Sequence, residues 1–475
     1  MQFNTYLFFL FFAWVLAVHY SPLPWSVRKG HLLAASYLFY AAWDPPLVLL
    51  LWLSTAADWY LARAIASADS QRRKKAMLLL SLAVNLGLLG YFKYGGFLVD
   101  NLAAGLDALG VSWSPAAPDI ILPIGISFYT FETLSYTIDV YRGHVRPFRS
   151  FTDYALFLGF FPHLVAGPIL RPAEIVPQFA EPRRASRAQL GWGLALLVLG
   201  IFEKNVIADG LLAPAADKAF APDVHQLDPA TAWIGTLAFA GQIFCDFAGY
   251  STSAIGAALC LGFHFPDNFR FPYAAIGFSD FWRRWHISLS RWLRDYLYVP
   301  LGGNRSGAVR TQVNLMLTML IGGLWHGASW TFVAWGGLHG LFLVGERLAR
   351  ARLGGATLWS TLPARLALGA LTFALVSVAW VFFRARSFGQ AFDHVAAMLG
   401  LGGGASDLAF NREEMILVLV PMGAILLLHW LLRDSSLERA VERCPWTVRS
   451  ARVAAVLVAI ACMPGTDRAF LYFQF

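Results

Sequence analysis

The residue best suited to chemistry in this sequence is His326, because it is an ionisable side chain inside an otherwise apolar stretch. It occurs in IGGLWHGASW, residues 321–330, within the apolar run 311–346. Taking an imidazole out of water is costly, so an ionisable group at membrane depth indicates a functional site. Histidine titrates near neutral pH and can act as a general base. The alternative is a neutral core histidine with one hydrogen-bond partner.

The neighbours of this histidine favour a pocket over simple packing. Gly322, Gly323 and Gly327 permit close backbone approach or a break in a helix. Trp325 and Trp330 flank the histidine and are large enough to wall a pocket for a small group. We therefore place a catalytic site in this segment.

A second candidate, His286, lies in a segment that alternates cations with large rings. The segment is DFWRRWHISLSRWLRDYLYVPLGGNR, residues 280–305. This pattern is typical of an amphipathic helix at the membrane surface, and also of the wall of a site for an anionic ligand. Neighbouring cations should lower the pKa of His286 and favour its neutral imidazole. Those cations are Arg283, Arg284, Arg291 and Arg294.

Two other histidines carry weaker predictions. His339 in WGGLHGLF would need further ligands and a supporting carboxylate to bind a metal, and we expect no metal site. His163 lies in FFPHLVAGPILRP, residues 160–172, whose prolines prevent one continuous helix. We interpret this stretch as a broken or re-entrant segment in which His163 lines a cavity. Three acids, Asp246, Asp280 and Asp295, are candidates to orient a histidine, and the sequence does not choose among them.

The composition predicts an all-α integral membrane protein. Of 475 residues, 57% are hydrophobic and only 14% are charged, whereas soluble domains carry about 25% charged residues. Apolar runs near the spanning length recur along the chain, which favours helices over barrel strands and roughly 10 to 12 crossings. No long polar linker interrupts them. We predict one membrane domain over residues 1–475, with a motif-rich catalytic region at 280–346.

The distribution of cations predicts the orientation. The formal net charge of +8 fits basic cytoplasmic loops, and we expect no nucleic-acid partner. Loops 21–30, 67–75 and 139–150 hold the cations, while the turn at 43–46 and the loop 93–118 hold few. The basic loops should face the cytoplasm and the N-terminus the outside. Residues 1–18 should form the first membrane helix, and the scattered cysteines should be small buried residues.

Several motifs together resemble the membrane-bound O-acyltransferases, and in particular their bacterial alginate O-acetyltransferase branch. The segment 280–305 is followed by NLMLTMLIGGLWHGASWTFVAWGGLHG at 314–340. Further support comes from PIGISFYTFETLSYTIDVYRG at 123–143, from 160–172 and from the terminal FLYFQF at 470–475. The matches are spread over nearly the whole chain.

The resemblance implies a ring of tilted transmembrane helices, with re-entrant and interfacial pieces, around a central tunnel. It assigns the essential histidine to His326 and the second polar position to His286. Arginines of the 280–305 segment suit the phosphates of an acyl donor. The substrate-binding residues predicted on this basis are Arg283, Arg284, Arg294, Asp295, Tyr296, Asn304, Arg305, Trp325 and Trp330.

The activity implied by the resemblance is O-acetylation at the cell inner membrane by a multi-pass enzyme without a bound cofactor. Acetyl groups would come from acetyl-CoA or a similar cytoplasmic thioester. They would pass to an extracytoplasmic polysaccharide, namely an alginate-like exopolysaccharide, cellulose or peptidoglycan, with help from a periplasmic acetyltransferase partner. Two alternatives remain: D-alanyl transfer in the teichoic-acid pathway, and a non-enzymatic membrane transporter, which would also use broken helices and buried ionisable groups.

Overall fold

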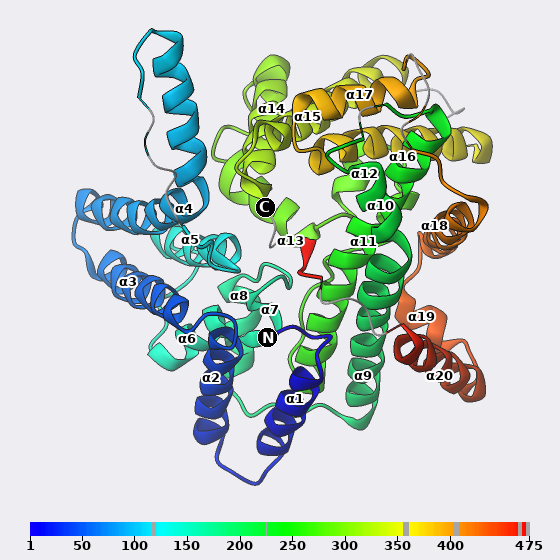
Figure 1. Ribbon diagram of the computed structural model, residues 1–475. Helices are drawn as coiled ribbons and strands as arrows, with labels where there is room; N and C mark the ends of the chain where they lie inside the picture. The colour runs from blue at the N-terminus through cyan, green and yellow to red at the C-terminus, as the bar shows by residue number, and fades with distance from the viewer. Residues whose placement is uncertain are drawn as a thin grey trace. The chain divides into compact units, whose positions relative to one another are not determined.

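All regular elements in the described part of the chain are helices, as the composition predicts (Figure 1). The computed structural model describes residues 1–113, 115, 120–224, 226–354, 361–402, 406, 408–463 and 468–471. Within these ranges the chain forms two compact units. One comprises Met1–Leu197 and Ser253–Pro266, and the other comprises Val198–Thr252 and Asp267–Phe475. Two of the boundaries fall within helices, in α9 (Arg187–Phe202) and α11 (Pro229–Cys260), and the third lies between Pro266 and Asp267.

The first unit is built around three helices that pack against one another, α3, α4 and α5. Buried polar contacts connect them; for example, the Asn85 amide of α4 donates to the Asp58 carboxylate of α3 at 2.6 Å. The helices of this unit before α9 are α1 (Tyr6–His19), α2 (Trp25–Ala41), η1 (Pro45–Leu47), α3 (Val48–Ser67), α4 (Gln71–Ala108), α5 (Ile126–Arg142), α6 (Phe151–Gly159), α7 (Phe161–Leu164) and α8 (Pro172–Phe179).

Two expectations for this unit have different outcomes. The stretch around His163 is broken into α6, α7 and α8, which confirms the interpretation from its prolines. The loop predicted at 93–118 is wrong in its first part, because α4 continues to Ala108. Leucine and alanine have high helix propensity, so α4 continues beyond the most apolar stretch from which we predicted the helix. Residues 114 and 116–119 of that loop lie outside the described ones.

The second unit contains the motif-rich region and a pair of helices, α14 and α15, that pack closely side by side. Besides its parts of α9 and α11, this unit contains η2 (Glu203–Leu212), α10 (Ala213–Ala219), η3 (Pro272–Ala274), α12 (Phe278–Trp282), α13 (Ile287–Leu293), η4 (Arg294–Tyr298), α14 (Gly307–His326), α15 (Trp330–Leu353), α16 (Leu362–Arg384), α17 (Phe388–Met398), α18 (Arg412–Leu432), α19 (Leu437–Glu442) and α20 (Trp446–Cys462).

The predicted surface helix at 280–305 is wrong. The chain forms three short pieces there, α12, α13 and η4, and Trp285 and His286 are completely buried between the first two. His286 itself adopts a left-handed backbone conformation with φ 42°, which cannot continue a right-handed helix. The run 231–263, predicted to be broken or paired, instead forms the single helix α11 of 32 residues.

The described helices include six that are long and apolar enough to cross a membrane, so the chain is a multi-pass membrane protein. These spans are Pro45–Ser67, Gln71–Ala108, Arg187–Ala219, Pro229–Cys260, Leu362–Arg384 and Arg412–Leu432. The predicted 10 to 12 crossings exceed this number. Shorter apolar helices such as α1, with 14 residues, fall below the roughly 20 residues that a perpendicular span requires.

The orientation is testable at the basic connection between α3 and α4. Asp69 is exposed there, whereas its neighbour Ser70 caps α4 by accepting a hydrogen bond from Arg73 N. We therefore choose Asp69→Cys, in a background with Cys444 and Cys462 replaced by serine. The cations that follow resist translocation, so an impermeant maleimide should label this cysteine only after permeabilisation. Labelling of intact cells would reverse the predicted topology.

Candidate active site

The position of His326 is set by an unusually close approach of α14 and α15. A Cβ atom on Gly323 would lie 2.3 Å from the carbonyl oxygen of Phe332, and one on Gly336 would lie 2.2 Å from that of Met319. Only glycine fits at these two positions without moving the helices apart. The close approach brings the last residue of α14, His326, against α15. The expectation of close backbone approach is thereby confirmed for Gly323, whereas a Cβ atom on Gly322 would meet the side chain of Leu293, at 3.1 Å.

The turn between the two helices is equally tight. A Cβ atom on Gly327 would lie 2.2 Å from the ring of Phe332. The hydroxyl of Ser329 accepts a hydrogen bond from Thr331 N and caps the start of α15. The predicted break beside His326 is therefore real, and it ends α14 directly at the histidine.

Aromatic rings surround the His326 imidazole, which is only 3% exposed. The centroids of Trp325 and Trp335 are each 5.0 Å from it, and that of Phe383 is 5.4 Å away. Such a box shields the imidazole from bulk water. Trp325 forms one wall, as predicted, and Trp335 forms another. The other predicted wall, Trp330, is 54% exposed at the first turn of α15.

The second histidine lies beside the first, in the same unit. The ring centroids of His286 and His326 are 6.5 Å apart, and His286 is fully buried. The rings of His286 and Phe247 are nearly perpendicular, with centroids 4.6 Å apart. The two candidate histidines, 40 positions apart in the sequence, therefore lie side by side. His286 reaches this place from the turn between α12 and α13 and not from a continuous surface helix.

Asn268 holds His286 in place and fixes its protonation pattern. The Asn268 side-chain oxygen accepts hydrogen bonds from the amide and the hydroxyl of Ser288 and lies 3.1 Å from His286 Nδ1. The Asn268 amide donates to Ser251 Oγ at 3.0 Å. Because that oxygen only accepts, His286 Nδ1 must carry the hydrogen. In the neutral imidazole the other nitrogen, Nε2, then carries the lone pair that a base requires.

The pKa of His286 is lowered from its ordinary value to about 3, and the cause is burial. The predicted direction is therefore confirmed, but the predicted cause, repulsion by neighbouring arginines, is not the operative one. The left-handed backbone at His286 costs about 1–3 kcal/mol. The main-chain bond from Ile287 N to Asn268 O, at 2.9 Å, and the side-chain bonds of Asn268 offset that cost.

The arginines of the segment have different environments. Arg284 is occupied by structural contacts: it pairs with Asp280 at 3.0 Å and donates to the carbonyls of Arg270 and Arg433. Its donors are therefore engaged within the fold. Arg283 and Arg294 are exposed, and Arg294 forms a bidentate pair with Asp295, at 2.6 and 3.1 Å.

The remaining predicted substrate residues lie on η4 and on the connection to α14. Tyr296 packs on Trp292 with ring centroids 5.2 Å apart. Asn304 and Arg305 are exposed in the connection, which is fastened by a hydrogen bond from Asn314 to Gly303 O. These positions suit contact with a charged ligand at the surface, and their roles stay predictions.

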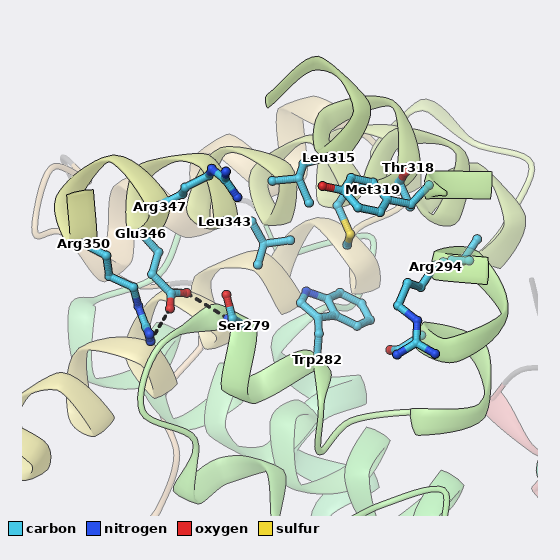
Figure 2. A pocket seen from close by; sticks show the side chains of 13 residues that line it. Ser279, Trp282, Arg294, Leu315, Thr318, Met319, Leu343, Glu346, Arg347 and Arg350 are labelled. Atoms are coloured by element: carbon cyan, nitrogen blue, oxygen red, sulfur yellow. Dashed lines mark hydrogen bonds and ion pairs between the residues drawn. The ribbon is translucent and has the colours of Figure 1, made fainter. Parts of the chain in front are cut away.

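A cavity of about 400 Å³ opens next to this segment (Figure 2). Figure 2 shows Trp282 between Arg294 on one side and Arg347 with Arg350 on the other. The rest of the lining is mainly apolar, with Leu293, Leu315, Met319 and Leu343 among the residues. Glu346 pairs with Arg350 at 2.6 Å, whereas Arg347 has no ion-pair partner among the described residues. The cavity therefore combines an apolar interior with a cationic edge.

An aromatic layer connects this cavity to His326. The Trp282 ring, which lines the cavity, lies 5.8 Å from Trp335, and Trp335 lies 5.0 Å from His326. His339 is fully buried in the same layer, 4.7 Å from Trp335. His163 belongs to the other unit, where it is buried and pairs with Glu132 at 3.1 Å.

Sequence reasoning missed Asn268, Trp335, Phe383 and Arg347. Trp335 and Arg347 lie on the helix that follows His326, and helical periodicity would have marked both as candidates once α14 and α15 were separated. Asn268 and Phe383 carry no sequence signal, because their roles arise only from contacts with segments distant in the sequence.

The chain is similar to known proteins over most of its length. The profile of the membrane-bound O-acyltransferase family matches residues 144–357. A probable alginate O-acetylase of Azotobacter vinelandii is 44% identical over 406 residues, which is 85% of this chain and 79% of that protein. A peptidoglycan O-acetyltransferase of Helicobacter pylori is 36% identical over 436 residues, 85% of this chain and 80% of that protein.

A third relative is more distant. A teichoic acid D-alanyltransferase of Streptococcus thermophilus is 29% identical over 236 residues, which is 46% of this chain and 56% of that protein. The extent of the first two matches shows that the chain belongs to the membrane-bound O-acyltransferase family. The predicted enzyme class, an O-acetyltransferase, is thereby confirmed.

The Asn268–His286 contact predicts a shift in pH dependence. In Asn268→Asp a carboxylate beside the imidazole favours its protonated form and raises its pKa, and a protonated imidazole cannot accept a proton. The acid limb of kcat/KM, which reports groups of the free enzyme, should therefore move to higher pH by about 1–3 units. Ser288→Ala, which removes a neighbouring donor but no charge, is the control. An unmoved acid limb in a folded Asn268→Asp protein would argue against His286 as a base.

Proposed function

We propose that this protein transfers acetyl groups from acetyl-CoA, or a similar cytoplasmic thioester, toward an extracytoplasmic polysaccharide, with His326 as the general base. The observation that carries the proposal is the His326 imidazole, enclosed by three aromatic rings and placed 6.5 Å from a second buried imidazole. Family membership supports acyl transfer, and the names of two relatives, an alginate O-acetylase and a peptidoglycan O-acetyltransferase, support acetyl as the group.

The cavity supports a donor that is both apolar and anionic. Arg294 and Arg347 lie at its edge in positions to meet phosphates, which arginine binds through charge-assisted hydrogen bonds. Its apolar interior suits the uncharged arm of a thioester donor. Trp282 of the cavity lining is in ring contact with Trp335, which packs against His326, and we place the acyl end of the donor on the side of these rings and its phosphates at the cationic edge.

The chemistry assigned to His326 is removal of a proton from the attacking hydroxyl. As the proton passes to the imidazole, the hydroxyl oxygen bonds to the acyl carbon, the carbon–sulfur bond breaks, and the departing thiolate takes up the proton. General-base assistance of this kind contributes about 10² to 10⁴ in rate, and holding both substrates in one aromatic box contributes further through proximity. His286, whose Nδ1 carries the hydrogen, supports the same proton transfer from its position beside His326.

The names of two relatives, a probable alginate O-acetylase and a peptidoglycan O-acetyltransferase, support a polysaccharide acceptor. We assign the protein to the cell inner membrane and its product to an alginate-like exopolysaccharide, cellulose or peptidoglycan. The direct acceptor is either a serine of a periplasmic acetyltransferase partner or a sugar hydroxyl. D-alanyl transfer is the competing activity within the family, and the shorter match to a D-alanyltransferase makes it the second choice.

Substitution of His326 tests the proposal directly. Purified His326→Ala enzyme in proteoliposomes should lose acetyl transfer from labelled acetyl-CoA by about 10² to 10⁴, with normal insertion and thermal stability. His394→Ala is the matched control: His394 is another buried histidine of the same unit, already bonded to Thr236 Oγ1 and Ala232 O. Near wild-type turnover in His326→Ala would refute the assignment, and wild-type enzyme that transfers only D-alanine would favour the alternative.

A second prediction concerns the cavity edge. Arg347→Ala and Arg294→Ala should each raise the KM for acetyl-CoA by about 10- to 100-fold, the effect of losing one charge-assisted bond, with little change in stability. Arg284→Ala should instead lower thermal stability, because its guanidinium holds Asp280 and two carbonyls. Arg310→Ala, an exposed arginine of α14 outside the cavity lining, is the control. An unchanged KM in both cavity variants would place the donor elsewhere.

A further inference from the structure

We propose that Asp246 is a positioning residue that seats the chain segment 468–471 against the ring supporting His286. This inference rests on the proposed function, because it concerns the geometry of the same histidine pair. Asp246 lies on α11, outside the cavity and outside the rings around His326, and the mechanism above does not use it. Its contacts nevertheless connect an ionic cluster to the histidines.

The ionic cluster consists of one cation and two acids, all buried. Lys204 lies in the π-helical segment η2, and its ammonium is 3.0 Å from Asp209 Oδ1 and 2.5 Å from Asp246 Oδ1. The three residues are 6%, 3% and 1% exposed. Ionisable groups buried in membrane helices are rare and usually functional, and π-helical turns are frequent at functional sites. One ammonium cannot satisfy all four carboxylate oxygens, so the acids need further donors.

Asp246 obtains its further donor from a distant part of the chain. Its second oxygen, Oδ2, accepts a hydrogen bond from the backbone amide of Leu471 at 3.0 Å. A hydrogen bond to a buried carboxylate is stronger than one between neutral groups. Leu471 and its neighbour Phe470 are 5% and 1% exposed. The contact therefore holds two apolar residues of the segment in the protein interior.

The ring of Phe470 packs against α11 next to the histidine site. It lies 5.7 Å from Phe247 and 5.2 Å from Tyr250, both on α11. Phe247 directly follows Asp246, so the carboxylate and the ring that receive the segment lie on one turn of one helix. Phe247 in turn lies nearly perpendicular to the His286 ring, with centroids 4.6 Å apart. Asp246 thus acts on the histidine only through Phe470 and Phe247.

A second ion pair fixes the start of the segment. Arg468 pairs with Asp217 of α10, which also binds Arg384 of α16 at 2.7 Å. Both ends of the segment 468–471 are therefore held. The partly exposed ion pair with Asp217 holds Arg468, and the buried hydrogen bond to Asp246 holds Leu471. Of the two, only the Asp246 contact lies next to the aromatic path to His286, which is why we assign positioning to it.

The matched pair of variants is Asp246→Asn and Asp209→Asn. Each variant replaces one of the two carboxylates that pair with the Lys204 ammonium. Of the two acids, only Asp246 also accepts a hydrogen bond from the Leu471 amide. An asparagine has one side-chain acceptor oxygen, which the ammonium of Lys204 will attract, so its amide group faces the Leu471 N–H, where two donors oppose each other. Asp246→Asn should release the segment, and Asp209→Asn should leave it seated.

The release is measured without any activity assay. Leu471→Cys keeps the backbone amide and places a thiol at a buried position, in a background with Cys444 and Cys462 replaced by serine. A thiol reagent should label this cysteine about 10- to 100-fold faster with Asp246→Asn than with Asp209→Asn, the change expected from losing one bond to a charged group. Equal labelling rates in the two variants would overturn the proposed seat.

Kinetics then separate positioning from general stability. Asp246→Asn should lower kcat about 10- to 100-fold, as misplacement of a catalytic group does, and leave the KM for acetyl-CoA unchanged. Phe470→Ala should have the same effect, and the double variant should be no worse than either single one, because both act through one contact. Additive losses, or a loss of kcat equal in Asp209→Asn, would show that Asp246 only stabilises α11 and η2.

The two tests also distinguish this inference from the proposed function. If wild-type enzyme transfers no acetyl group, the proposed function fails while the labelling comparison still reports whether Asp246 seats the segment. If acetyl transfer depends on His326 but labelling is equal in the two variants, the positioning proposal fails alone.

Discussion

The site depends on one constraint, the backbone contact between α14 and α15 at Gly323 and Gly336. Any side chain at either glycine would push the helices apart, and His326, the last residue of α14, would leave its place against Trp335. The aromatic box, the layer toward the cavity and the neighbourhood of His286 all follow from that approach. Helices in membranes use small residues in this way because dispersion contacts, rather than expulsion of water, drive their association.

The second requirement is a neutral, correctly protonated imidazole in a place without water. Asn268 meets it with a single oxygen that accepts from His286 and from Ser288. Burial keeps the ring neutral, and the amide fixes which nitrogen carries the hydrogen. The left-handed backbone at His286 is the strain that this arrangement stores, and strained positions of this kind cluster at functional sites.

The family and the helical class could be predicted from the sequence because each depends on local pattern, and local pattern also selected His326 and His286, whose catalytic roles stay predictions. Apolar runs mark helices, prolines mark the broken stretch after Phe160, and glycines mark the turn at His326. Contacts between distant segments could not be predicted. The periodicity of 280–305 suggested a surface helix, yet Trp285 and His286 are buried because partners such as Asn268 and Phe247 lie elsewhere in the sequence. The hydrogen bonds of Arg284 to the carbonyls of Arg270 and Arg433 were hidden for the same reason.

The most direct test is an experimental structure of the protein with an analogue of acetyl-CoA in which a methylene replaces the thioester sulfur. The account predicts the acyl carbonyl beside the His326 imidazole, with space for an attacking hydroxyl within hydrogen-bond reach of about 2.6–3.2 Å. The phosphates should lie at Arg294 and Arg347. An acyl group bound away from His326, with the aromatic box filled by protein side chains alone, would contradict it.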